Sequence, residues 1–265
     1  MNRLFFLFFL LICSLEGAEV SDILKTIPPK DRQKIEKVFT YLVQRDSLGY
    51  VLFGETKPAA ICSIPIACKY ALIPPSFVEG PFFKYQNSLK QCWAIWKHYE
   101  GRFKHANLIV CEEHNRFKSS SFLQLIFINK PRLKQLLEQY EEDFIQVLGA
   151  NFSPEEFIAR LEQKKQLRPL IRHDEKLLGL ILGFGKESAE AFKNNDLSET
   201  ADHPLGYAFY RPPNCSITLV SFRGNPESKE VQELLEAYTK EIPVIEEALK
   251  SDSFLVSLLE KFCCF

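Results

Sequence analysis

Residues 108–149 have the sequence LIVCEEHNRFKSSSFLQLIFINKPRLKQLLEQYEEDFIQVLG, and this stretch decides the fold. Leu108–Cys111 and Phe122–Ile128 are β-rich apolar runs, and the polar segment Glu112–Ser121 connects them as a hairpin turn. The second run is apolar on both faces, which is typical of a strand in the centre of a sheet. Asn129 and Pro131 then begin a helix whose apolar stripe continues to Gly149, a residue that favours helix termination.

The chain before this stretch contains two further helices and a second strand pair. Asp31–Ser47 carries apolar residues at three- and four-residue spacing, and Asp31 is its expected N-cap. Leu48–Gly54 and Ala59–Ile66 are apolar runs separated by a polar turn, and they predict strand, turn and strand. Tyr70–Pro81 contains three prolines and is expected to be a loop. Asn87–Phe103 has an aromatic face that is typical of a core-facing helix.

The chain after Gly149 is mostly helical in its pattern. Ser153 and Glu156 form a capping box at the start of a helix that reaches about Gln166. The remaining elements that we expect are a helix at His173–Leu182, a helix at Lys186–Asn194, a loop at residues 196–215, a strand at Ser216–Phe222, and a helical end at Glu227–Phe262 with a break at Pro243.

These elements predict an α+β fold with a small, mostly antiparallel sheet and more helix than strand, because the two hairpin-like pairs favour antiparallel pairing. The alternative is a doubly wound parallel α/β sheet. Residues 19–265 are expected to form a single globular domain with a helical C-terminal part, since a chain of this size suits one core.

The first 18 residues, MNRLFFLFFLLICSLEGA, have the pattern of a secretory signal peptide. Arg3 supplies the positive charge, Leu4–Ile12 is an apolar run too short to span a bilayer, and cleavage is expected after Gly17 or Ala18. We therefore expect an exported protein, periplasmic or secreted, with no transmembrane span in the mature chain. Lipid anchoring through Cys13 is a weaker alternative because Ile12 precedes it, and retention of the segment is another.

The overall charge excludes one class of partner. The formal net charge is −1, with 46% hydrophobic and 25% charged residues, which is ordinary for a globular protein. A near-neutral chain has no excess of positive charge to attract the phosphates of nucleic acid, so nucleic acid is not expected as a partner.

Gly179–Ser188, GLILGFGKES, has only a superficial likeness to a phosphate-binding loop. Five residues instead of four separate Gly179 from Gly185, and Glu187 stands where a hydroxyl residue would bind magnesium. We interpret Gly183–Gly185 as a turn between helices, where glycine relieves backbone strain. No cofactor is expected.

Four residues have side chains of metal-ligand type within a short span: His98, His105, Cys111 and His114. They are weak candidates, because no second close pair exists at the spacing of a zinc finger, and we predict no metal site. No local motif of a nucleophilic hydrolase is present either, so the catalytic residues, if there are any, remain unassigned.

Leu48–Gly54, the helix from Trp93 to Phe103, Leu125–Asn129 and Leu177–Phe192 together resemble a chlamydial family of exported proteins of unknown function. The resemblance covers about residues 35–200. It implies placement in the envelope or the secreted fraction, and it brings no assigned catalytic or binding residue.

Two functions fit these observations. The first is a non-enzymatic exported domain that binds another protein or an envelope component, which an exposed apolar patch would favour. The alternative is an exported hydrolase without a recognisable motif, with its site near the proline-bearing loops at residues 67–85 and 196–215. A cleft with an activated serine, cysteine or histidine would favour the hydrolase.

Overall fold

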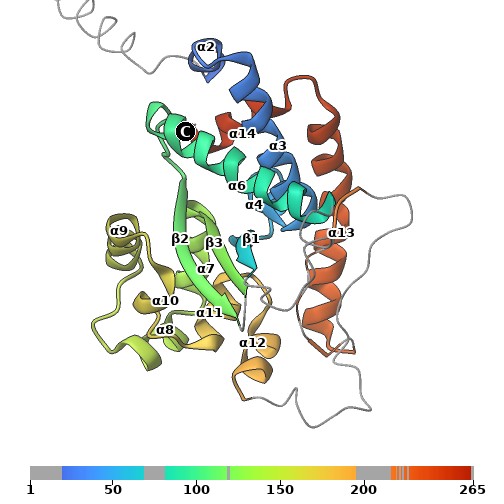
Figure 1. The fold of residues 1–265 in the computed structure, drawn as a ribbon. Coiled ribbons are helices and arrows are strands. Elements are labelled where there is room, and N and C mark those ends of the chain that lie inside the picture. Colours follow the sequence, from blue (N-terminus) through green and yellow to red (C-terminus); the bar gives the residue numbers. More distant parts are fainter. Residues whose placement is uncertain are drawn as a thin grey trace, which may run out of the picture.

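A computed structural model describes residues 20–68, 81–117, 120–194, 216–218, 220, 222, 224–225 and 227–263, without the side chains of residues 65–68, 81–87, 114–117 and 120–122. The leader at residues 1–18 and the expected loop at 196–215 lie outside this part, as do residues 70–80 of the loop expected at Tyr70–Pro81, whose last residue begins a helix. Figure 1 shows the arrangement of the elements. In chain order, these are α2 (Val20–Lys25), α3 (Pro29–Arg45), α4 (Leu48–Leu52), β1 (Ala59–Cys68), α6 (Pro81–Tyr99), η1 (Glu100–Arg102), β2 (Leu108–Phe117), β3 (Ser120–Asn129), α7 (Lys130–Gln139), α8 (Glu141–Leu148), α9 (Pro154–Lys164), α10 (Leu167–Leu170), α11 (Glu175–Ile181), α12 (Lys186–Lys193), α13 (Lys229–Lys250) and α14 (Phe254–Cys263).

The three described strands form one antiparallel sheet in the order β1-β3-β2. The fold is therefore α+β with more helix than strand, as predicted, and β3 lies in the centre, as its apolar pattern indicates. Ile126 of β3 pairs with Ile61 on one side and with Cys111 on the other. The doubly wound parallel alternative does not describe this sheet.

Each face of the sheet is covered by its own hydrophobic core. Leu125 and Phe127 of β3 face a core shared with α3, α4, α6, α13 and α14. Ile126 and Ile128 face a second core built by α7 to α12. The alternation follows from the two-residue period of a strand, so β3 separates the two helical layers seen in Figure 1.

Several helix ends follow the local rules that the sequence indicates. The Asn129 side chain accepts a hydrogen bond from the Arg132 amide (3.1 Å), and Ser153 Oγ accepts one from the Glu156 amide (3.3 Å). Both are therefore N-caps. Gly149 ends α8 with φ 107°, a conformation that suits glycine.

The expected strand at Leu48–Gly54 is wrong, because Leu48–Leu52 forms the helix α4. All five residues of α4 are buried, so the run is apolar on every side and carries no period that would separate strand from helix. Gly49 shows how closely α4 is enclosed: a Cβ there would lie 2.5 Å from Ile245 Cγ2 of α13.

The expected strand at Ser216–Phe222 is also wrong for the residues described there, which have no strand assignment. Ile217, Val220 and Phe222 are buried members of the core that also contains α3 and α6. The Thr218 amide donates to the carbonyl of Gln44 at the end of α3 (2.9 Å). The apolar pattern in this segment therefore reflects packing rather than membership of the sheet.

Three element boundaries also differ from expectation. The polar segment Glu112–Ser121 belongs mostly to the hairpin strands, which reach Phe117 and start again at Ser120. The helix expected from Pro131 to Gly149 is divided at Tyr140 into α7 and α8. Helix α13 continues through the exposed Pro243 and ends at Lys250, because Tyr238, Ile242 and Ile245 anchor both sides of the proline in the core.

Asp31 is not the N-cap of α3, because the helix begins at Pro29 and Pro28 occupies the cap position. The Asp31 carboxylate instead accepts a hydrogen bond from the Tyr99 hydroxyl (2.9 Å), which links α3 to α6.

Candidate functional site

An apolar pocket of about 280 Å³ lies between α11 and α12. Phe192 stands at its edge with 45% of its surface exposed, and among the described residues only Val244 is a comparably exposed large hydrophobic side chain. Arg168 and Glu175 supply its charged rim. The side chains that line it further are those of Leu178, Leu182, Phe184, Ser188, Ala189 and Phe222.

The turn between α11 and α12 shapes the pocket. Gly183 and Gly185 adopt φ values of 74° and 81°, which residues other than glycine rarely adopt. The expected helix-to-helix turn is therefore confirmed. The turn holds Phe184 against Phe222, with the ring centroids 5.4 Å apart and the rings stacked. This pair forms one wall of the pocket.

The rim charges of the pocket are already paired. Arg168 Nη1 lies 3.4 Å from Glu175 Oε1, and Arg168 Nε lies 3.6 Å from Glu113 Oε2 on β2. The Ser188 hydroxyl is buried and has no hydrogen-bond partner in the described part of the chain. The pocket thus offers apolar surface and one hydroxyl, but no unpaired charge, so its chemistry suits a neutral apolar group.

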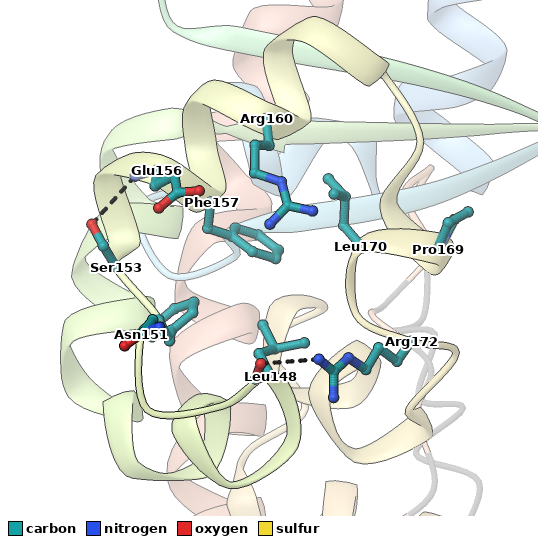
Figure 2. Close-up of a pocket in the computed structure, with 10 residues that line it drawn as sticks. Leu148, Asn151, Ser153, Glu156, Phe157, Arg160, Pro169, Leu170 and Arg172 are labelled. Carbon is teal, nitrogen blue, oxygen red and sulfur yellow. Dashed lines mark hydrogen bonds between the residues drawn. The ribbon is translucent and has the colours of Figure 1, made fainter.

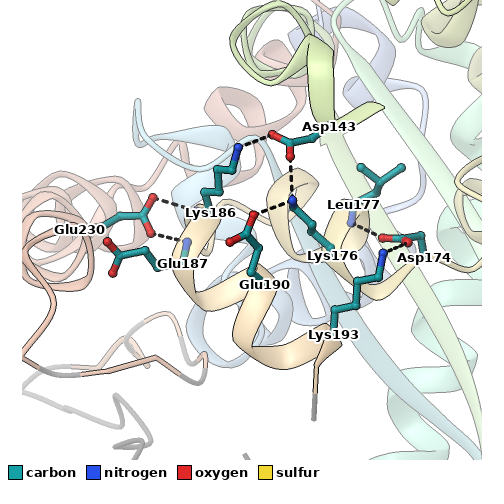
Figure 3. Close-up of polar contacts among 9 residues, drawn as sticks. All are labelled: Asp143, Asp174, Lys176, Leu177, Lys186, Glu187, Glu190, Lys193 and Glu230. Carbon is teal, nitrogen blue, oxygen red and sulfur yellow. Dashed lines mark hydrogen bonds and ion pairs between the residues drawn. The ribbon is translucent and has the colours of Figure 1, made fainter. Parts of the chain in front are cut away.

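A network of ion pairs holds α12 against α8 and α11, as Figure 3 shows. Asp143 of α8 is buried and binds Lys176 Nζ at 2.7 Å and Lys186 Nζ at 3.0 Å. Lys176 also binds Glu190 at 2.6 Å. Burial alone would raise the pKa of the Asp143 carboxyl, but the two ammonium groups outweigh it and hold the pKa below its ordinary value.

Both ends of α12 are fixed from outside the helix. The Glu230 carboxylate of α13 accepts hydrogen bonds from the amides of Lys186 and Glu187, each at 2.8 Å. At the other end, Lys193 Nζ binds Asp174 Oδ2 at 2.8 Å, and the other oxygen of Asp174 caps α11 through the Leu177 amide. Because α11 and α12 are tied in this way, the pocket between them is preformed rather than created by a ligand.

Lys57 is a buried amine in the wall between the two layers. Only 2% of the residue is exposed, and Nζ donates to the Leu182 carbonyl at 2.6 Å. The amine also lies over the rings of Phe184 (4.8 Å to the centroid) and Tyr238 (5.6 Å). Burial lowers the pKa of Lys57 to about 7, although the nearby Glu241 carboxylate favours its charged form.

The four candidate metal ligands are not gathered into a site by the described structure. His98 is exposed on α6 and packs on Tyr99. His105 is half-buried and stacks on Trp96 of α6, and burial lowers its pKa. Cys111 is buried on the opposite face of the sheet, among α7 to α12. The side chain of His114 lies outside the described part, and no cluster of metal-ligand residues occurs among the residues that were described.

Three of the four described thiols do not have the character of nucleophiles, and the fourth, Cys263, is half-buried at the end of α14. Cys62, Cys92 and Cys111 are all buried. Burial raises the pKa of all three, to about 12 for Cys111, so each is a protonated thiol at neutral pH. The proline-bearing loops named for a hydrolase site lie largely outside the described residues.

No helix in the described ranges is long and apolar enough to cross a membrane. The sequence matches no protein-family model and no curated protein, and no solved structure matches the chain.

The sequence patterns predict neither the pocket nor the burial of Lys57. One signal for the pocket is present in α12, where Ala189 and Phe192 are three residues apart and form a short apolar stripe. Nothing local marks Lys57, because its burial depends on α13 and on the turn after α11, which are distant in sequence.

Proposed function

We propose that this protein is an exported, non-enzymatic binding domain whose partner is another protein or a component of the envelope. The partner inserts an apolar side chain into the pocket between α11 and α12. The observation that carries this proposal is Phe192, which stays 45% exposed at the edge of an apolar cavity instead of joining the core. Exposed apolar surface beside a preformed pocket is typical of a recognition site.

The size and charge of the pocket define the group that it binds. A volume of about 280 Å³ accommodates one aromatic or branched aliphatic side chain. Arg168 is neutralised by Glu113 and Glu175, so the pocket has no unpaired charge to attract an ionic group. The favourable free energy comes from burial of apolar surface, at about 25 cal/mol per Å².

The binding test uses blocked amino acids and methyl NMR. N-acetyl-phenylalanine amide and N-acetyl-leucine amide should shift the methyl signals of Leu178, Leu182 and Ala189 in a saturable way, whereas N-acetyl-serine amide should not. Phe192→Ala should weaken binding of the phenylalanine amide about five- to tenfold, because it removes roughly 1 kcal/mol of contact. Val244→Ala is the matched control, since it shortens the other exposed apolar side chain outside the pocket.

Equal binding of the serine amide, or no shift with either apolar amide, would contradict the proposal. Hydrolysis of an ester or peptide by the purified protein would contradict its non-enzymatic part.

The export part is tested separately. The protein in the exported fraction should have an N-terminus that follows Gly17 or Ala18, the two cleavage positions that the leader pattern favours. A chain that still begins at Met1 in the soluble cytoplasm would overturn it.

A further inference from the structure

A second cavity, of about 430 Å³, opens between α8, α9 and α10, as Figure 2 shows. It shares no lining residue with the apolar pocket, and its lining is mixed rather than apolar. Its volume lies within the range of about 300–1,000 Å³ that is usual for small-molecule sites. The lining residues are Leu148, Asn151, Phe152, Ser153, Glu156, Phe157, Arg160, Pro169, Leu170 and Arg172.

Arg160 presents its charge to this cavity. Glu156 precedes it by four residues on α9, a spacing at which helical ion pairs usually form. No such pair is present, and no carboxylate within the described ranges lies within ion-pair distance of Arg160. Figure 2 shows its guanidinium turned inward between Phe157 and Leu170. The fork of this guanidinium is therefore open to an anion from outside the protein.

Arg172 forms the opposite wall of the cavity. Its Nη1 and Nη2 atoms donate to the carbonyls of Val147 and Leu148, at 2.8 and 3.1 Å, where α8 ends. Arg172 and His173 both adopt left-handed backbone conformations, with φ values of 54° and 57°. Such strain in residues other than glycine costs about 1 kcal/mol or more for each residue and is concentrated at ligand sites. Two arginines against Glu156 give the lining a net charge of +1.

The floor of the cavity is aromatic. The rings of Phe152 and Phe157 have centroids 6.0 Å apart, and both pack on Phe144 in the core below. We propose that this cavity binds a monoanionic carboxylate that carries an apolar group, either as a free acid or as the C-terminal residue of a peptide. Arg160 pairs with the carboxylate through its two parallel N–H donors, and the apolar group lies on the aromatic floor.

Three probes test the proposal, with the methyl signals of Leu148 and Leu170 as reporters. 3-Phenylpropionate represents a free acid, N-acetyl-phenylalanine represents a chain terminus, and N-acetyl-phenylalanine amide lacks the carboxylate. Both carboxylates should bind saturably at this site, at least about tenfold more tightly than the amide. If the free acid binds more tightly, the source is a small acid; if N-acetyl-phenylalanine does, the source is a peptide. Either result supports the proposal.

Two variants that each remove one positive charge distinguish specific binding by Arg160 from non-specific attraction to the charge of the protein. Arg160→Gln should weaken both carboxylates about tenfold, because it removes the guanidinium fork. Lys164→Gln removes the same charge one turn later on α9, at an exposed position outside the cavity, and should leave binding unchanged. Equal weakening by the two variants, or equal binding of the amide, would overturn the proposal, as would the absence of saturable shifts.

The two sites are distinguishable in the same experiments. Phe192→Ala should leave carboxylate binding at Leu148 and Leu170 unchanged, since Phe192 does not line this cavity.

Discussion

At the scale of single residues, the amine of Lys57 has a pKa far below its ordinary value. Its amine lies in a nearly closed site made by the Leu182 carbonyl and the rings of Phe184 and Tyr238. The protonated form is stabilised by these contacts, but the loss of water outweighs them, and the pKa falls from 10.5 to about 7. The folded protein therefore releases a proton that the unfolded chain retains at mildly basic pH.

This proton release makes the free energy of unfolding depend on pH. Between about pH 7 and pH 10.5, the unfolded state binds more protons at Lys57 than the folded state does, so stability rises with pH in this window. The increase from pH 7 to pH 8.5 should be about 1.5 kcal/mol, at up to about 1.4 kcal/mol for each pH unit. Urea titrations at the two pH values measure it.

Lys57→Met should remove most of this increase, because it keeps an unbranched side chain, shorter by one atom, and removes the titrating amine.

The comparison ends at pH 8.5 because the buried thiols have the opposite effect at higher pH. Burial raises the pKa of Cys62 and Cys111, so the folded state binds more protons than the unfolded state above about pH 9. An unchanged pH slope in the variant would show that Lys57 does not titrate in this range.

Residue-level predictions from the sequence succeeded where the partners are local. The caps at Asn129 and Ser153 bond to amides three residues away, so their pattern is visible in a short window. Asp31 also had a suitable local pattern, but its partner is Tyr99, 68 residues later. A contact at that sequence separation leaves no trace in the local pattern.

At the scale of elements, Glu230 connects the long helix α13 to the start of α12. Its carboxylate accepts two amide hydrogen bonds at an N-terminus where the cap residue, Gly185, has no side chain to accept them. The negative charge also lies at the positive end of the α12 dipole. A residue from one layer thus completes a helix of the other.

Glu230→Ala should lower the free energy of unfolding by about 1–2 kcal/mol, because two amides lose their acceptor. Urea denaturation measures the loss. Glu233→Ala is the matched control, since Glu233 lies on the same helix and pairs only with the highly exposed Lys229 in the described structure. A similar loss in both variants would mean that removal of a negative charge from α13, rather than capping of α12, explains the effect.

Helices were predictable from the sequence where the apolar residues repeated with a clear helical period over several turns. The stripes of α3, α6 and α9 have the spacing of one buried helix face, and these helices were confirmed. Helix α4 was not predictable in this way, because all of its residues are enclosed by other elements. The continuation of α13 through Pro243 likewise depends on core contacts beyond the helix itself.

At the scale of the whole molecule, the two layers share one sheet. Strand β3 contributes Leu125 and Phe127 to one core and Ile126 and Ile128 to the other. The single domain expected from the sequence stays a prediction, and this sharing suggests how to test it. Loss of one core should destabilise the sheet and hence the other core, giving a single cooperative transition.

Phe144→Ala tests this coupling. Phe144 is fully buried in the layer of α7 to α12, so its truncation should cost about 3–5 kcal/mol. The two tryptophans of the chain, Trp93 and Trp96, are in the opposite layer and report on it by fluorescence. The fluorescence midpoint in urea should therefore fall with the circular dichroism midpoint.

The exposed Phe192→Ala variant is the control for this experiment, because it makes the same substitution in the same layer outside the core. If Phe144→Ala leaves the tryptophan midpoint in place while part of the helical signal is lost, the two layers unfold separately.

The sequence by itself determined the helix stripes, the central position of β3, the caps at Asn129 and Ser153, and the turn at Gly183–Gly185. These features depend on residues within one or two turns of each other, or on the period of a single element. The tertiary structure alone decided that Leu48–Leu52 is helical, that His105 and Cys111 lie on opposite sides of the sheet, that Lys57 loses its water, and that Phe192 borders a pocket. Burial, pKa and cavities arise from groups far apart in the chain, so no local pattern specifies them.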